Sequence, residues 1–218
     1  MQITFEDVRQ NQAINAYIQK ADESLIALGY TEHSFPHVLK VASTASQILT
    51  ELGYSPREAE LAKIAGYLHD IGNIVNRIEH AQSGAVMAFR ILDNMGAEAE
   101  DIATIVTAIG NHDESTAFPV NSVAAALILA DKTDVRRTRV RTQPLEQFDI
   151  HDRVNFSVTH SQVMIEKTAI TLDITIKTEI CDVLEYFEIF MERMLLCRRA
   201  AEQLKVAFHL IVNGQKMM

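Results

Sequence analysis

Apolar residues recur at every third or fourth position through most of residues 1–140, which is the spacing of helices with one buried face. This pattern predicts helices over residues 4–28, 35–52, 56–70, 80–95, 97–111 and 123–134. Glycine, which favours the left-handed conformation found at helix ends, is expected to end three of them, at Gly29, Gly53 and Gly96. Ser55, Pro56 and Glu58 predict a capping box at the start of the third helix, and Ser122 is expected to cap the last.

The run LAKIAGYLHD, residues 61–70, is the segment on which the functional interpretation depends. Its apolar residues follow helical spacing, so one face should be buried and the His69-Asp70 doublet should lie beside the core. Gly66 allows a neighbouring helix to come close, and Gly72 is expected to stop the helix. A histidine and a carboxylate are costly to bury unless they are paired or bind a metal. The doublet is therefore the first candidate for a functional site.

Beyond residue 141 the pattern changes from helical spacing to alternation. Residues 170–176 alternate apolar and polar side chains, which predicts a half-buried strand, and residues 162–166 are its expected hairpin partner across a turn at Lys167 and Thr168. A helix over residues 179–204 and a short strand over residues 206–212 are predicted to follow. The predicted fold is therefore mainly α, with a helical domain over residues 1–145 and a small ββαβ appendage over residues 146–218.

The long helix predicted over residues 179–204 has a wide apolar face, which includes Leu184, Phe187 and Met191. Packing against both the small sheet and the helical body is one explanation. The other is a homodimer that forms through this helix, because an exposed apolar face often marks a contact between subunits. The sequence leaves both explanations open.

Composition and charge exclude some classes of partner. The 218 residues are 48% hydrophobic, enough for a sizeable core, and carry a net charge of −9 with no basic run. We therefore expect no binding to a nucleic acid polymer, whose phosphates need a basic surface. No apolar stretch reaches the roughly 20 residues of a membrane span, so no membrane association is expected. The amino-terminal segment MQITFEDVRQ lacks the features of a secretion signal, which predicts a cytoplasmic protein.

Histidine and aspartate recur at or near the ends of the predicted helices, where several helices can direct side chains into one cavity. Six residues share this placement: His37, His69, Asp70, His80, His112 and Asp131. Imidazole and carboxylate groups bind divalent metals such as iron, manganese and zinc, and the set contains no thiolate of the kind found in structural zinc sites. One ion requires only four of them: His37, His69, Asp70 and Asp131. His80 and His112 would serve a second ion, with Asp70 bridging the two.

The order of these residues and their local contexts, AGYLHDIGN, EHAQSGA, IGNHDE and ILADKTD, resemble the HD-domain superfamily of metal-dependent phosphohydrolases over roughly residues 30–140. The resemblance implies a helical bundle in which all six residues are metal ligands. The version with both His80 and His112 resembles the di-iron branch, which includes symmetrical dinucleoside-tetraphosphate hydrolases and other nucleotide-cleaving enzymes. It implies two divalent ions as cofactors, iron or manganese, with zinc, nickel and magnesium as alternatives.

Basic residues beyond the last aspartate are the candidates for holding an anionic substrate. Lys132 is expected to bind phosphate, as the resemblance implies, and to take part in catalysis with Asp70. The acidic chain contains one basic cluster, formed by Arg136, Arg137, Arg139 and Arg141. Arg136 and Arg137 are the members expected to bind substrate, unless the cluster is simply a solvated face. Asn73 stands where the family usually has a basic residue soon after the doublet.

Further polar residues near the predicted ligands have two interpretations each. His33 lies one helical turn before His37 and either orients it or is an exposed loop histidine. Asp113 and Glu114, next to His112, either assist the site or lie at a solvated helix end. The remaining histidines are expected to be structural: His151, His160 and His209.

The leading hypothesis is a metal-dependent phosphohydrolase that cleaves a phosphoester or phosphoanhydride bond in a nucleotide or other small phosphorylated metabolite, with a metal-activated hydroxide as nucleophile. A second hypothesis is a metal-binding regulatory or interaction module of the same fold without turnover. A third is a di-iron oxygenase, because some relatives with similar ligands have that activity. Turnover of phosphate esters that disappears on chelation would favour the phosphohydrolase. Binding of such compounds without turnover would favour the regulatory module, and oxygen consumption would favour the oxygenase.

Overall fold

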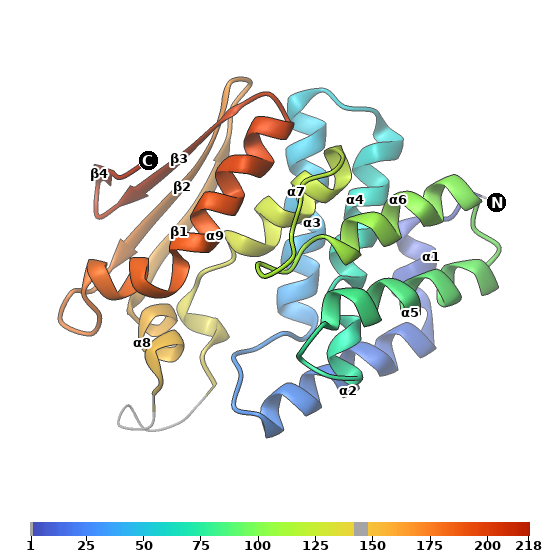
Figure 1. Ribbon diagram of the computed structural model, residues 1–218, viewed down its shortest axis with the longest axis horizontal. Helices are drawn as coiled ribbons and strands as arrows, with labels where there is room; N and C mark the ends of the chain where they lie inside the picture. The colour runs from blue at the N-terminus through green and yellow to red at the C-terminus, as the bar shows by residue number, and fades with distance from the viewer. Residues whose placement is uncertain (1, 142–147) are drawn as a thin grey trace.

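The computed structural model describes residues 2–141 and 148–218 and shows a helical body beside a small sheet (Figure 1). The helices of the body are α1 (Phe5–Gln10), α2 (Gln12–Ala27), α3 (Phe35–Leu52), α4 (Pro56–Leu68), α5 (His80–Asn94), α6 (Ala99–Gly110) and α7 (Ser122–Lys132). Two short 3-10 helices, η1 (Ile71–Ile74) and η2 (Arg137–Arg139), follow α4 and α7. The predicted fold class, mainly α with a small carboxyl-terminal sheet, is confirmed.

The helix predicted over residues 4–28 is wrong in one respect, because the structure divides it into α1 and α2 at Asn11. The backbone of Asn11 is extended, and its side-chain oxygen accepts hydrogen bonds from the backbone N–H groups of Ala13 and Ile14. Asparagine side chains compete with helical hydrogen bonds in this way and are favoured at helix starts. After the break, α1 contacts α4 while α2 contacts η1.

The helix ends around the core mostly agree with the prediction. α3 ends at Gly53, whose φ of 86° is left-handed, and α4 begins with the predicted capping box between Ser55 and Glu58. The cap of α7 is Asn121 rather than the predicted Ser122, because the Asn121 side chain reaches a backbone N–H in the first turn. Ser122 instead donates its hydroxyl to Glu58 and so joins the start of α7 to the start of α4.

The centre of the body is α4, which contacts α3, α6 and α7. Gly66 permits the contact with α3, since a Cβ at this position would lie 2.7 Å from the Cα of Ala42. The predicted close approach at Gly66 is therefore confirmed. Because the carboxyl end of α4 is enclosed by its neighbours, the doublet that follows it is also buried, as predicted for His69 and Asp70.

The carboxyl-terminal part contains a mixed sheet, whose strands lie in the order β1 (Val158–Ile165), β2 (Ala169–Ile176), β3 (Ala207–Val212) and β4 (Gln215–Lys216). β1 and β2 form the predicted antiparallel hairpin, and β2 and β3 are parallel and joined by α9 (Val183–Gln203). α8 (Ile150–Ser157) and β4 were not predicted, because both are too short to show a clear period. The domain boundary predicted at residues 145–146 lies outside the described residues, so the division into two domains stays a prediction.

α9 lies between the sheet and the helical body (Figure 1), where it contacts β2, β3, α7 and α8. These contacts account for most of its wide apolar face, as the packing explanation predicts. Leu184 and Met191 remain exposed, with 78% and 41% of their surface accessible, and a homodimer through α9 stays a prediction. Within the described parts of the chain, no helix combines the length and the apolar character that crossing a membrane requires.

Candidate metal centre

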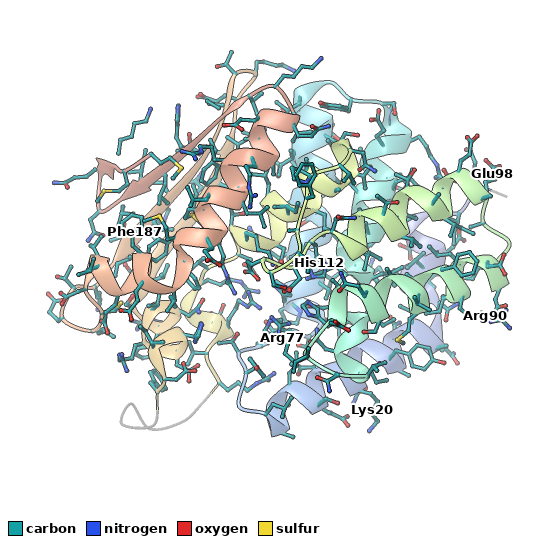
Figure 2. All side chains as sticks on the ribbon, viewed as in Figure 1. Lys20, Arg77, Arg90, Glu98, His112 and Phe187 are labelled. Atoms are coloured by element: carbon teal, nitrogen blue, oxygen red, sulfur yellow. The ribbon has the colours of Figure 1, made fainter. Side chains whose placement is uncertain are left out.

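The structure brings the six predicted donors together in the middle of the helical body. They stand at the ends of helices that converge there: His37 in the first turn of α3, His69 and Asp70 directly after α4, His80 at the start of α5, His112 after α6, and Asp131 in the last turn of α7. Asp131 is partly buried and the others are buried. Figure 2 shows His112 near the centre of the molecule, whereas Lys20, Arg90 and Glu98 lie at its edge.

The first group of donors contains the four residues predicted to hold one ion. The Nε2 atoms of His37 and His69 lie 3.3 Å apart. Asp70 Oδ2 lies 3.6 Å and 3.3 Å from these two nitrogens, and Asp131 Oδ1 lies 3.4 Å and 3.7 Å from them. Ligands bound at about 2.1 Å in a tetrahedral arrangement around one ion are separated by about 3.4 Å. The spacing of this group therefore fits a shared cation.

The second group uses the other oxygen of Asp70. The Nε2 atoms of His80 and His112 lie 3.2 Å apart, and the His80 nitrogen lies 3.4 Å from Asp70 Oδ1. Ligating atoms of these three residues all lie within 4.8 Å of one another. Asp70 thus presents one carboxylate oxygen to each group, which is the arrangement that a bridging ligand requires.

Hydrogen bonds on the far side of the histidine rings direct Nε2 into the cluster. Three rings donate from Nδ1 to the backbone carbonyl three residues earlier: His69 to Gly66 at 2.8 Å, His80 to Arg77 at 3.1 Å and His112 to Ile109 at 2.6 Å. A carbonyl oxygen can only accept, so Nδ1 carries the proton and the neutral ring has its lone pair at Nε2. Metal-binding histidines usually have this state and this kind of support.

His37 is oriented differently, by the carboxylate of Asp134, whose Oδ2 lies 2.8 Å from Nδ1. Arg136 donates to Oδ1 of Asp134 at 2.8 Å, and Arg139 donates to its backbone carbonyl at 3.1 Å. Burial opposes ionisation of Asp134, but the hydrogen bond from His37 and the charge of Arg139 lower its pKa. Asp134 was not predicted, although its place three residues after Asp131 is a usable signal in the sequence.

The donor set fits a cation because it leaves lone pairs facing one another. With Nδ1 protonated, the paired Nε2 atoms have no proton to share, and the buried Oδ2 of Asp70 has no hydrogen-bond donor among the residues that the structure describes. Such an arrangement is unfavourable in a buried site unless a positive charge is bound there. Despite burial, which opposes protonation, Asp70 and Asp131 raise the pKa of His69, so the carboxylates stabilise positive charge at this point. The local cavity of about 20 Å³ has room for an ion or a water molecule.

Lys132 connects the cluster to α9. Its Nζ lies 2.6 Å from Asp131 Oδ2 and 3.4 Å from Glu114 Oε2, and Glu114 Oε1 lies 2.5 Å from Nε of Arg193 on α9. Burial opposes the charge on Lys132, but Asp131 and Glu114 raise its pKa. Burial likewise opposes ionisation of Glu114, but Lys132 and Arg193 lower its pKa to about 2. Lys132 is therefore an ammonium group between two carboxylates at the edge of the cluster.

Two arginines that were not predicted, Arg77 and Arg193, line the cavity at the cluster. Arg77 donates to Asn73 at 3.3 Å and lies 4.0 Å from Asp70, so it places a positive charge close to the doublet. Its position four residues after Asn73 is a signal that the sequence offers. Arg193 has no comparable signal, because only the packing of α9 brings it to the cluster.

The predicted substrate-binding arginines lie away from this cavity. Arg136 pairs with Asp134 at 2.8 Å and with Glu32 at 3.7 Å, and the guanidinium carbon of Arg137 lies 4.1 Å from the ring centroid of Phe156. Among the described residues, neither arginine lines the space at the cluster. Substrate binding by Arg136 and Arg137 stays a prediction, and their contacts favour a structural role.

Two other candidates have clearer positions. His33 is partly buried, and its ring meets the edge of the His37 ring with 5.4 Å between centroids, although Asp134 is the group that hydrogen-bonds to His37. Asp113 accepts a hydrogen bond from the hydroxyl of Ser115 at 2.6 Å and belongs to neither of the described donor groups.

The stretch of chain that carries the six donors matches a known protein family. The model of the HD domain matches residues 35–153, which is more than half of the chain and includes all six donors. The chain belongs to the HD-domain family. The predicted resemblance to this superfamily is therefore confirmed at the level of the family.

Individual relatives of this HD-domain protein are distant. It is 26% identical over 170 residues to the uncharacterized protein MJ1020 of Methanocaldococcus jannaschii, covering 67% of this chain and 65% of that protein. It is 28% identical over 121 residues to ribonuclease Y of Bacillus subtilis, covering 55% of this chain and 21% of that enzyme. A crystal structure of a predicted HD superfamily hydrolase from an uncultured Thermotogales bacterium has 25% identity and a TM-score of 0.46, covering 57% of this chain and 68% of that one. The chain thus spans about two thirds of MJ1020 and about a fifth of ribonuclease Y.

Gly72 joins the two halves of the site in this HD domain. It was predicted to stop α4, but it lies in η1 and allows α5 to approach, since a Cβ there would overlap the backbone of His80 and Gly84. We expect Gly72→Ala to destabilise the protein by about 1–3 kcal/mol and to lower its metal content, because α5 must carry His80 away from Asp70. Denaturant unfolding and elemental analysis measure both effects.

The matched control for this change is Gly110→Ala, since a Cβ at Gly110 would lie 3.6 Å from Ala85, an ordinary contact. This control should keep the stability and metal content of the wild-type protein. If Gly72→Ala also kept the stability and metal content of the wild-type protein, the assigned packing of η1 against α5 would be contradicted.

The pH dependence of the metal-free HD domain should reflect His112. Burial, the neighbouring histidines and Lys132 lower its pKa to about 3, whereas an unfolded histidine titrates near pH 6.5. Between these values the unfolded chain binds a proton that the folded protein does not, so stability falls as pH falls, by up to about 1.4 kcal/mol per pH unit. His112→Gln should therefore flatten the dependence between about pH 6 and pH 4.5.

Urea unfolding at a series of pH values, with a chelator present, measures this dependence. His160→Gln is the control, because His160 is exposed on β1. Identical slopes for the wild-type protein and His112→Gln would contradict the assigned environment of His112.

Proposed function

We propose that this HD-domain protein is a metal-dependent phosphohydrolase that cleaves a phosphoester or phosphoanhydride bond in a small phosphorylated compound such as a nucleotide. The observation that carries the proposal is the pair of donor groups that share Asp70, next to a cavity rich in cationic side chains. The residues lining that cavity include four cations and two anions: Arg77, Lys132, Arg139 and Arg193 against Asp70 and Asp131. Glu114 pairs with Lys132 and Arg193 and offsets part of this positive charge, and the charge that remains in the cleft attracts an anionic ligand.

The donor set supports two divalent ions. The first group would hold one ion, and Asp70, His80 and His112 would hold the second. Iron or manganese is our expectation, with zinc, nickel and magnesium as alternatives, because imidazole and carboxylate ligands suit these metals. When bound, such ions lower the pKa of a coordinated water and offset the charge of a phosphoryl group.

The remaining functions come from the side chains of the chain itself. Arg77 and Arg193 would bind phosphoryl oxygens, because guanidinium groups donate paired hydrogen bonds to such anions. Lys132 offsets the charge of Asp131, so that this carboxylate repels an approaching phosphate less. Asp134 would keep His37 in the tautomer whose Nε2 faces the cluster. Burial of the cluster limits the access of bulk water.

Two larger substrates are also candidates. The order of the ligands in the sequence predicts an enzyme of the di-iron branch, which includes enzymes that cleave dinucleoside tetraphosphates, and part of the chain is similar to ribonuclease Y. RNA hydrolysis is the weaker of these candidates, because the chain carries a net charge of −9 and a polymer of phosphates needs a basic surface. Both substrate classes belong in the test.

The test is an assay of the full chain loaded with Mn²⁺ or Fe²⁺. The substrates are p-nitrophenyl phosphate, nucleotides, a dinucleoside tetraphosphate and an RNA oligonucleotide, and oxygen consumption is followed in parallel. We expect phosphate-ester cleavage that stops when the metal is chelated and returns when it is restored. Binding without cleavage would instead favour a regulatory module, and metal-dependent oxygen consumption would favour an oxygenase.

A further inference from the structure

A second and larger cavity, of about 370 Å³, lies where the helical body meets α8 and α9. Its lining comes from residues 28–31 between α2 and α3 and from residues of α8 and α9. Four side chains line both this cavity and the small space at the metal cluster: His33, Arg77, Arg139 and Arg193. The two spaces therefore adjoin, and the larger cavity is the room available to whatever is attached to a group at the cluster.

Cationic groups mark the end of the cavity that adjoins the cluster. The guanidinium carbon of Arg77 lies 5.5 Å from the ring centroid of Tyr30, and that of Arg193 lies 4.6 Å from the ring centroid of Phe190. Both rings also line the cavity. Cation–π attraction to a ring leaves the N–H groups in the plane of a guanidinium accessible. Arg77 uses Nη1 on Asn73 and Arg193 uses Nε on Glu114, so the N–H groups on their other nitrogens are the ones that can bind an anion. This end of the cavity suits a phosphate.

Acceptors mark the opposite end. Asp149 caps α8, Asp152 lies in its first turn, and Asn155 lies one turn further along, and all three line the cavity. Asp149 accepts the backbone N–H of Asp152 through Oδ1 at 2.8 Å, and its Oδ2 lies 3.5 Å from Nδ1 of His151, which also lines the cavity. The carboxylates at this end would repel a second phosphate, whereas Oδ2 of Asp149 would accept a hydrogen bond from a hydroxyl or amino group. The two ends of the cavity therefore suit different parts of a ligand. The end beside the cluster suits an anionic group, and the end at α8 suits a group with O–H or N–H hydrogen-bond donors.

We propose that this cavity binds the alcohol part of a phosphate monoester, an uncharged or cationic group that carries O–H or N–H donors. The phosphate of the bound monoester lies between Arg77 and Arg193 beside the cluster, and the O–H or N–H groups of its alcohol part face Asp149. The volume of about 370 Å³ is in the range of small-molecule sites and suits one sugar, nucleoside or amino alcohol. The same charges disfavour a chain of phosphates, so polyphosphates and RNA should be poorer substrates. This inference rests on the proposed phosphohydrolase function and deepens it.

The test compares kcat/KM of the metal-loaded full chain for donor-bearing monoesters with that for phenyl phosphate, which has no donors. The donor-bearing probes are a sugar phosphate, a nucleoside monophosphate and phosphoethanolamine, and the best of them identifies the source of the donors. We expect that probe to be preferred over phenyl phosphate by about tenfold or more, the usual effect of a hydrogen bond to a charged group. The kcat/KM for that probe should also exceed the kcat/KM for a dinucleoside tetraphosphate and for an RNA oligonucleotide.

Asp149→Lys should lower the ratio of these kcat/KM values about tenfold, because the lysine removes the acceptor and repels donors. Asp93→Lys, at an exposed aspartate near the end of α5, is the matched control and should leave the ratio unchanged. An unchanged ratio in Asp149→Lys, or a preference for polyphosphate or RNA, would overturn the proposed cavity.

A separate readout keeps this inference distinct from the proposed function. If no phosphate ester is cleaved, the phosphohydrolase function fails, and calorimetric titration of the same monoesters then tests the cavity alone. Binding of a donor-bearing monoester that Asp149→Lys weakens about tenfold supports the cavity. Absence of binding by every monoester overturns it.

Discussion

Replacing Asp70 by alanine is expected to remove the second ion, weaken the first and abolish turnover. Each of its carboxylate oxygens faces a different donor group, at 3.3 Å from His69 and 3.4 Å from His80, so one substitution opens both groups. Metal ions contribute several kcal/mol to such transition states, and about 1.4 kcal/mol is a factor of ten in rate. We therefore expect turnover to fall at least about a thousandfold, measured together with metal content by elemental analysis.

Asp113→Ala is the control for this substitution. Asp113 is also close to the cluster along the chain, but it accepts a hydrogen bond from Ser115. The Asp113→Ala variant should keep its metal, and its turnover should differ only a few-fold from that of the wild-type protein. Turnover in Asp70→Ala near the wild-type rate, in a protein whose circular dichroism shows the native fold, would remove the proposed mechanism.

Replacing Lys132 by methionine is expected to have the second largest effect, on both stability and metal binding. The ammonium group lies between the carboxylates of Asp131 and Glu114, and removal of one partner from a buried charge cluster costs about 3–5 kcal/mol. Without it, the pKa of Glu114 should rise from about 2 toward its ordinary range. Denaturant unfolding with and without metal measures the loss.

A second substitution separates the charge effect from lost packing. In the double variant Lys132→Met and Glu114→Gln, one of the two carboxylates no longer carries a charge, so part of the lost stability should return. Glu114→Gln alone should destabilise the protein, because it leaves Lys132 and Arg193 with less compensation. A double variant no more stable than Lys132→Met alone would contradict the assigned role of Lys132.

The donors could be predicted from the sequence because they obey a local rule. Each lies in the first or last turn of a helix, or directly after one, and the apolar spacing of these helices is clear. Helices that share a core bring their ends together. His37, His69 and Asp70 needed only this rule and the correct helix boundaries. The break at Asn11 did not disturb the prediction, because α1 and α2 carry none of the donors.

The groups around the donors depend on tertiary packing and could not be predicted in the same way. Arg193 lies 81 positions beyond His112 and reaches the cluster only because α9 packs against α7. Arg136 has the right charge and lies close to Asp131 along the chain, yet it supports Asp134 rather than lining the cavity. The charge of a residue does not predict the direction of its side chain. That direction depends on packing against elements that are distant in the sequence, as the packing of α9 against α7 shows.

The central claim is that His37, His69, Asp70 and Asp131 share a metal ion. Crystals of the metal-loaded protein, measured at the absorption edge of the element found by elemental analysis, test it most directly. We predict an anomalous peak among these four side chains, and a second peak about 3.5–4 Å away between Asp70, His80 and His112. A folded protein with the donor geometry described here and no anomalous peak among the first four residues would contradict the account.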